Sequence, residues 1–183
     1  LQDQDAGADA FNVAIGYQAG TQVTTGVRNV LIGGLAGDAL TTGGYNTAIG
    51  YQALSTEDAH GYNTAIGYAA LIAQDAGADA YNTAVGYYAG VAVTTGTESV
   101  FIGGLAGGAL TTGARNIAIG YAALSTEDTG GHNVAIGRNA LSVLDAGADG
   151  HNVAIGSSAG KAVSTGVENT IIGFNAGVAL TTG

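Results

Sequence analysis

The sequence predicts an all-β protein, a parallel β-solenoid of about ten short turns. Three observations lead to this fold class. Glycine makes up 33 of the 183 residues, while proline is absent. The segment Asn12-Val-Ala-Ile-Gly16 recurs along the whole chain. Each repeat carries so few large apolar residues that it cannot bury a core alone, so neighbouring repeats must close the core together.

The repeat has a fixed length and a longer period superimposed on it. The turns begin at Asn12, Asn29, Asn46, Asn63, Asn82, Ser99, Asn116, Asn133, Asn152 and Asn169. The sequence spacing between successive turns is 17, except for two intervals of 19, so a super-repeat of four turns recurs with a period of 70. We treat residues 1–183 as a single repeat array. Because the chain lacks Met and begins part-way through a repeat, we expect it to be a fragment of a longer chain.

Other repetitive folds fit the composition poorly. Collagen needs Gly at every third residue and is rich in proline, and neither feature is present. Helical repeats need about 33 residues or more, and a glycine in every turn would weaken a helix. Short strands are therefore the better interpretation.

We number the places in each turn from the Asn that opens it. The fourth place is always β-branched, which predicts one short strand per turn with this column pointing into the core. The second place (Val, Thr or Ile) would share that face, and the third, mostly Ala, would lie on the opposite face. The fourth-place residues are Ile15, Ile32, Ile49, Ile66, Val85, Ile102, Ile119, Ile136, Ile155 and Ile172.

Glycine at the fifth place and alanine at the eighth are retained in all ten turns, which predicts a bend where a side chain would collide with neighbouring backbone. A further apolar anchor occupies either the twelfth or the ninth place. Twelfth-place anchors are Val23, Leu40, Val93, Leu110, Val163 and Leu180, and ninth-place anchors are Leu54, Leu71, Leu124 and Leu141.

The predicted core is thin, so we expect association between chains to complete it. One turn in each super-repeat carries a large residue at the third place, namely Leu31, Phe101 or Ile171. On the predicted outer face, these residues would be contacts between protomers.

The string Asn46-Thr-Ala-Ile-Gly-Tyr-Gln-Ala-Leu54 and its copies resemble the head repeats of trimeric autotransporter adhesins of the YadA-like type, over essentially the whole chain. The resemblance implies a left-handed β-roll, a homotrimer, and display on a bacterial surface for attachment to host protein, glycan or other cells. Similar repeats occur in phage tail fibres. These turns are longer than the family's commoner unit, with the extra residues in the Thr-Thr-Gly and Ser-Thr-Glu-Asp corners.

Charge excludes some partners. The net charge is −10, and the four basic residues are Arg28, Arg115, Arg138 and Lys161, so we expect no binding to nucleic acid. The longest apolar stretches, such as 116–124, are too short to span a bilayer, so no membrane insertion is expected within this segment. The absence of cysteine leaves the redox compartment undetermined.

The sharpest chemical feature is a pair of acidic clusters, Glu57/Asp58/Asp75/Asp79 and Glu127/Asp128/Asp145/Asp149. Asp58 and Asp75 share the thirteenth place of adjacent turns, so their carboxylates would repel each other unless solvent or Ca²⁺ screens them. The Asp-Ala-Gly-Ala-Asp segments lack the Asp-x-Asp-x-Asp ligand spacing. We therefore favour solvated turns whose Asp side chains accept local backbone hydrogen bonds, and assign no metal ligand or cofactor.

Two further columns are expected on the outer surface. The residues before each Asn are Arg28, Tyr45, Tyr62, Tyr81, Glu98, Arg115, His132, His151 and Glu168, and Tyr51, Tyr68 and Tyr87 form a second column. Tyrosine ladders can bind sugars or proteins, but stacking between adjacent strands also explains them, and we favour that structural role. His132 and His151 would be neighbours, yet Tyr62 and Tyr81 replace them one super-repeat earlier, which argues against a dedicated metal site.

No catalytic centre is predicted. His60 has no His or Cys nearby in sequence, and no Ser-His-Asp order recurs with the repeat. The glycine-rich segment 32–37 is followed by no Lys and no helix, so it is interpreted as a β corner and not a phosphate-binding loop. The Thr-Thr pairs, such as Thr24-Thr25 and Thr41-Thr42, raise an ice-binding alternative, but two acidic turns interrupt each threonine rank.

The sequence thus predicts a non-enzymatic fibre or adhesin module, extracellular on a bacterial surface or on a virion, that mediates attachment or extends a binding tip. The alternatives are a phage tail-fibre segment, a passive structural spacer and, more remotely, an ice-binding solenoid.

Overall fold

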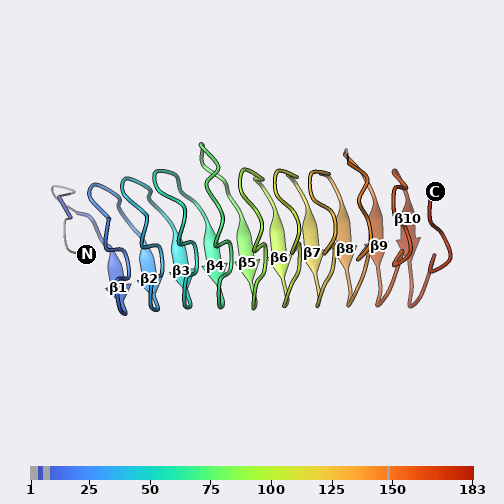
Figure 1. Ribbon diagram of the computed structural model, residues 1–183, viewed down its shortest axis with the longest axis horizontal. Coiled ribbons are helices and arrows are strands. Elements are labelled where there is room, and N and C mark those ends of the chain that lie inside the picture. Colours follow the sequence, from blue (N-terminus) through green and yellow to red (C-terminus); the bar gives the residue numbers. More distant parts are fainter. Residues whose placement is uncertain (1–3, 6–8, 148) are drawn as a thin grey trace.

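A computed structural model describes residues 4–5, 9–147 and 149–183. These residues form an all-β solenoid, with ten parallel strands in one sheet that pair in chain order, and they contain no helix (Figure 1). The strands are β1 (Val13–Ile15), β2 (Val30–Ile32), β3 (Thr47–Ile49), β4 (Thr64–Ile66), β5 (Thr83–Val85), β6 (Val100–Ile102), β7 (Ile117–Ile119), β8 (Val134–Ile136), β9 (Val153–Ile155) and β10 (Thr170–Ile172). The predicted fold class and the single strand per turn are confirmed.

The register follows the sequence period. Val30 pairs with Thr47 across one of the shorter intervals, whereas Thr64 pairs with Thr83 and Val134 with Val153 across the two longer ones. In these two longer coils the connection extends beyond those of the other coils, as the loops between β4 and β5 and between β8 and β9 show (Figure 1). A Cβ on Gly77, within the first of these loops, would meet no atom within 4 Å. The longer coil between β4 and β5 therefore keeps the stack in register because its additional residues extend outward.

The predicted orientation of the strands is wrong. The third place faces the core: Ala48, Ala65 and Ala118 have no exposed surface, while Ile49 and Ile119, at the fourth place, are partly exposed. The second and fourth places point outward on the same face of the sheet. The alternation of side chains along a strand identifies two faces but does not tell which of them is buried. Because the coil is narrow, its inner positions are taken mostly by small side chains, and the β-branched side chains point outward.

Leu31, Phe101 and Ile171 are consequently core residues and not the protomer contacts that the sequence predicted. Leu31 and Phe101 have no exposed surface and Ile171 is 8% exposed. Each large side chain lies over a glycine at the ninth place of its own coil. A Cβ on Gly37 would come within 2.8 Å of Leu31, and one on Gly107 within 2.4 Å of Phe101. A large third-place residue and a ninth-place side chain therefore exclude each other.

The residues at the third and ninth places within each four-turn period are consistent with this exclusion. Coils with Ala at the third place and Leu at the ninth, such as that of Leu71, fill their own centre. The coil of Ala84 has Gly90 at the ninth place. The space beside Gly90 is filled by Leu71 from the preceding coil and by Phe101 from the following coil. Each of these side chains would lie within 2.9 Å of a Cβ added to Gly90. Two coils with a twelfth-place anchor are followed by two with a ninth-place anchor, as predicted, and these side chains belong to one continuous core.

An internal ladder of asparagine side chains joins the coils, which the sequence analysis did not foresee. The backbone N–H of Asn46 donates to Oδ1 of Asn29 (2.9 Å), and Nδ2 of Asn29 donates to the carbonyl of Gly43 (2.9 Å). The arrangement recurs along the stack, with Ser99 replacing one Asn and accepting from the N–H of Asn116 (3.1 Å). Because most of these amides are buried and hydrogen-bonded, the opening Asn is an interior structural residue along the middle of the stack, although Nδ2 of Asn63 has no partner.

The glycine at the fifth place behaves as predicted. Gly50 has φ 138°, and a Cβ there would lie 2.3 Å from the carbonyl oxygen of Gly67 in the next coil. Only glycine fits both this backbone conformation and this approach of two main chains. The eighth-place alanines, such as Ala53 and Ala123, are buried beside the bend. No helix in the part of the chain that the structure describes is long and apolar enough to cross a membrane.

Candidate functional site

The outward face of the sheet is a long strip without charged residues. We call the second-place and fourth-place side chains the outward strip. Its members are Val13, Ile15, Val30, Ile32, Thr47, Ile49, Thr64, Ile66, Thr83, Val85, Val100, Ile102, Ile117, Ile119, Val134, Ile136, Val153, Ile155, Thr170 and Ile172. Even in the middle of the stack these side chains contact solvent, with Ile102 39% and Ile117 36% exposed. The strip thus forms an uncharged, mostly aliphatic face along the whole stack.

A tyrosine ladder borders the strip on the side of the fifth-place glycine. Tyr51, Tyr68 and Tyr87 stack with centroids 5.6 Å apart in both pairs. Tyr88 packs edge-on against Tyr68 at 5.4 Å and Tyr87 at 4.4 Å. The predicted column therefore exists and its three rings are exposed.

A second tyrosine ladder lies on the other side of the strip, before the Asn of each turn. Tyr62 stacks on Tyr45 and on Tyr81, both at 4.9 Å and nearly parallel. Arg28 lies over the outer face of Tyr45, 5.1 Å from its centroid. Desolvation by these neighbours, reinforced by the adjacent phenols, raises the pKa of Tyr62. Both faces of the Tyr62 ring are covered by its neighbours, so a ligand could contact only its edge and hydroxyl, whereas Tyr81 is stacked on one face only.

The same column changes character in the second super-repeat. Glu98 and Arg115 form an ion pair (Oε2 to Nε, 3.0 Å), and the hydrogen bond from Arg115 lowers the pKa of Glu98. His132 then stacks on His151, with centroids 4.8 Å apart, which confirms that they are neighbours. Nδ1 of His132 lies 3.3 Å from Oδ2 of Asp149. Among the described residues, the groups able to hold a metal ion do not include this histidine pair.

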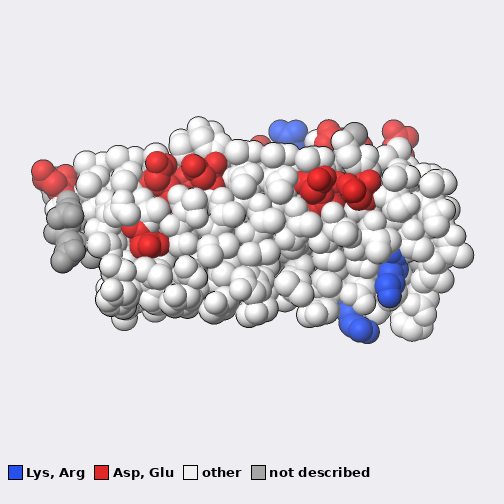
Figure 2. Space-filling view, in the orientation of Figure 1, with Lys and Arg blue, Asp and Glu red and all other residues white. Residues whose placement is uncertain are grey.

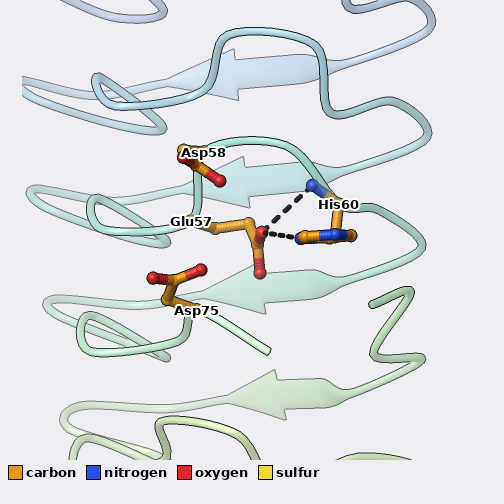
Figure 3. A group of neighbouring side chains, drawn as sticks. All are labelled: Glu57, Asp58, His60 and Asp75. Carbon is orange, nitrogen blue, oxygen red and sulfur yellow. Dashed lines mark hydrogen bonds and ion pairs between the residues drawn. The ribbon is translucent and has the colours of Figure 1, made fainter. Parts of the chain in front are cut away.

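The acidic clusters are rearranged relative to the prediction. Glu57, Asp58 and Asp75 converge, and His60 joins them, with one potential ligand atom from each lying within 4.8 Å of the others (Figure 3). Asp79 is separate because its Oδ1 accepts a hydrogen bond from the N–H of Gly61 (3.0 Å). Gly61 lies in the preceding coil, so this is not the local turn hydrogen bond that the sequence analysis expected. In the second super-repeat Glu127, Asp128 and Asp145 converge, while Asp149 reaches His132. We call the two converging groups the first and second acidic corners.

Glu57 is the unexpected member of the first acidic corner, because its side chain has no exposed surface. Its Oε1 accepts from the N–H of His60 (3.1 Å) and lies 3.3 Å from the His60 Nδ1. Its Oε2 is buried without a hydrogen-bond partner. Burial raises the pKa of Glu57, and the N–H groups of His60 and Ala76 partly oppose that rise. The N–H of Ala76 thus lies near the carboxylate but outside hydrogen-bond geometry.

Glu127 occupies the equivalent place with both oxygens satisfied. Oε1 accepts from the N–H of Gly130 (2.9 Å) and Oε2 from the N–H of Ala146 (3.2 Å). The first acidic corner has His60 where the second has Gly130. The two corners therefore share their three carboxylates but differ in how the buried glutamate is held.

The two other features considered as functional sites, the glycine-rich segment and the threonine pairs, have structural roles. The glycine-rich segment 32–37 begins at the end of β2 and is a β corner, as predicted. The threonine rank is interrupted, since Thr41 is followed in the stack by Asp58, and Asp75 is followed by Thr94. The hydroxyl of Thr24 donates to the carbonyl of Thr41 (3.1 Å).

Sequence reasoning missed the outward strip, the burial of Glu57 and its contact with His60. One signal was present for the strip. Large third-place residues always coincide with Gly at the ninth place, which indicates that these two places face each other across the core. Comparisons of this chain with protein-family models, with curated proteins and with solved structures find no match.

Proposed function

We propose that this chain is a non-enzymatic rod module of an attachment fibre, extracellular on a bacterial surface or on a virion, and that it works as a homotrimer. The observation that carries the proposal is the outward strip, an uncharged β-branched face that runs along all ten strands. A monomeric rod would leave this face in water along its whole length, which soluble monomers seldom do.

A second copy of the same chain is the partner that best fits the outward strip. The strands of one solenoid repeat at about 4.8 Å, and only a partner with the same spacing keeps its side chains in step with the strip over many coils. Charge favours this too, because the strip holds no charged group that needs an opposite charge. Closed rotational symmetry would bury all strips at one axis, and three copies agree with the resemblance to YadA-like head repeats.

In such an assembly the outer surfaces carry the fibre's remaining function. The ladders flank the strip, and the stacking of Tyr51, Tyr68 and Tyr87 favours contact through their hydroxyls over stacking on sugar rings. An adhesive module would use these edges to bind host protein or glycan. A passive spacer or tail-fibre segment would use the same rod only for length.

Binding of labelled protein to collagen, to immobilised glycans and to cells separates the two roles. The informative variant changes Tyr51, Tyr68 and Tyr87 to Phe, since it preserves the stacked rings and removes only their hydroxyls. An adhesive role through this ladder predicts at least a tenfold loss of binding, and the matched control is the same change at Tyr45, Tyr62 and Tyr81. Absence of binding by the wild-type protein to every surface would support the spacer.

An ice-binding role has less support, because the thirteenth-place hydroxyls of Thr24 and Thr94 are committed to carbonyls of the next coil. Thermal hysteresis measured on the purified protein tests it directly, and a clear hysteresis gap would favour this alternative over the fibre module.

A further inference from the structure

We propose that the first acidic corner, formed by Glu57, Asp58 and Asp75, is a Ca²⁺ site. The three carboxylates come from two consecutive coils, those that follow β3 and β4. In Figure 3 the Asp58 and Asp75 side chains flank Glu57, and the Glu57 oxygen that does not contact His60 points toward the coil of Asp75. The proposal is independent of the assembly and adhesion proposed above.

The buried oxygen of Glu57 is what distinguishes this corner from an ordinary acidic surface. Oε2 has no hydrogen-bond partner and the Glu57 side chain has no exposed surface. A buried carboxylate oxygen without a partner is costly, and a cation bound to it would remove that cost. The exposed carboxylates of Asp58 and Asp75 give a cation access from solvent.

The local charge also favours a cation. Asp58 and Asp75 occupy the same place in adjacent coils and repel each other. Among the described residues, neither aspartate has an Arg or Lys ion-pair partner. The basic group at this corner is His60, which pairs with Glu57. Figure 2 shows acidic groups over the coils of β3 and β4 with no basic side chain beside them on this face. A divalent ion would neutralise most of this charge.

The chemistry of the corner indicates which cation. Its ligand atoms lie within 4.8 Å of one another. One ion with Ca²⁺-to-oxygen distances of about 2.3–2.6 Å can therefore contact all three carboxylates. Three carboxylates form the hard oxygen set that Ca²⁺ prefers. A softer metal such as Zn²⁺ would also bind the His60 ring nitrogen, which lies 3.3 Å from Oε1 of Glu57.

The second acidic corner is an internal control. It has the same three carboxylates, but the backbone N–H groups of Gly130 and Ala146 already satisfy both oxygens of Glu127. A cation there would compete with these hydrogen bonds for the glutamate. We therefore expect the first corner to bind Ca²⁺ more tightly than the second, at least tenfold.

Isothermal titration of the whole chain with CaCl₂ tests this assignment. The wild-type protein should bind one Ca²⁺ per chain in its tightest step, and the double variant Asp58→Asn/Asp75→Asn should lose that step. The matched variant Asp128→Asn/Asp145→Asn should retain it. Circular dichroism melting, run in parallel, should show a Ca²⁺-dependent rise in Tm for the wild type and the second variant only, with both variants folded in the absence of Ca²⁺.

Three results would overturn the site. One is the absence of Ca²⁺ binding by the wild-type protein. Another is an unchanged tightest step in Asp58→Asn/Asp75→Asn. The third is a preference for Zn²⁺ over Ca²⁺ that disappears in His60→Gly, which would make the corner a site for a softer metal.

Discussion

The first super-repeat (12–81) and the second (82–151) share one interior and differ at their edges. Leu31 becomes Phe101 and Gln74 becomes Leu144 inside the stack, but the glycine bends and the strand register are the same. At the edge, the stacked Tyr45, Tyr62 and Tyr81 are replaced by Arg115, His132 and His151. The comparison indicates that interior packing determines the shape of the coil, whereas the edge residues can change without altering that shape.

The fifth-place glycines should give the largest effects, equal in both super-repeats. Gly50→Ala and Gly120→Ala each place a Cβ within 2.3–2.6 Å of backbone in the next coil, so each should destabilise the fold by more than about 3 kcal/mol. Gly77→Ala, in open space, should cost about 1–2 kcal/mol for its left-handed backbone. Chemical denaturation measures all three. A Gly50→Ala cost no greater than that of Gly77→Ala would contradict the close packing of coils.

The third place gives the next largest effect and tests the corrected strand orientation. Phe101 is fully buried, so Phe101→Ala should cost about 3–5 kcal/mol. Phe101→Leu converts this coil to the Leu31 arrangement and should cost less than about 1.5 kcal/mol. Ile102→Ala, on the outward face, should cost less than Phe101→Ala when measured on the same monomer under dilute conditions. The reverse order would place the β-branched face inside.

These corrections show where sequence reasoning reached its limit. The period, the strands, the glycine bends and the anchors at the ninth and twelfth places follow from spacing and residue size, and all were predicted. The inner face of the strand was not, because Ala48 and Ile49 alternate equally well in either orientation. Nor was the position of Glu57, which depends on how a corner closes over it. His60 and Glu57 are near in sequence, but their contact follows from the shape of that corner.

The two versions of the edge ladder should respond differently to salt. Tyr62→Ala removes two stacked pairs, and its modest loss of stability should be the same in low and high salt because aromatic stacking is uncharged. Arg115→Ala removes an exposed ion pair with Glu98, so its smaller loss should vanish in high salt. Thermal melts at two salt concentrations provide the measurement. Equal salt dependence of the two variants would contradict the assignment of aromatic stacking to one part of the ladder and an ion pair to the other.

The acidic corners should differ in pH dependence when Ca²⁺ is chelated. Burial raises the pKa of Glu57 above its ordinary value of 4.5, so its ionised form opposes folding at neutral pH. This penalty shrinks as pH falls through the folded-state pKa and is absent below the unfolded value. Glu57→Gln should therefore stabilise the protein at pH 7 relative to the wild type and lose this advantage near pH 4.

Glu127→Gln is the control for that experiment. Because two backbone N–H groups hold both oxygens of Glu127, its replacement should remove a favourable hydrogen bond and give no stabilisation at pH 7. Urea denaturation across this pH range compares the two variants. Equal stabilisation by both would contradict the distinction between the corners.

The mass of the protein in solution tests the role of the outward strip most directly. Sedimentation equilibrium should give three times the mass of a single chain for the wild type. The variant Ile49→Lys/Ile66→Lys/Ile119→Lys, which charges the strip, should sediment as a folded monomer, while Thr42→Lys/Thr112→Lys, at exposed places off the strip, should remain trimeric. A monomeric wild-type protein, or an unchanged mass after charging the strip, would contradict assembly through this face.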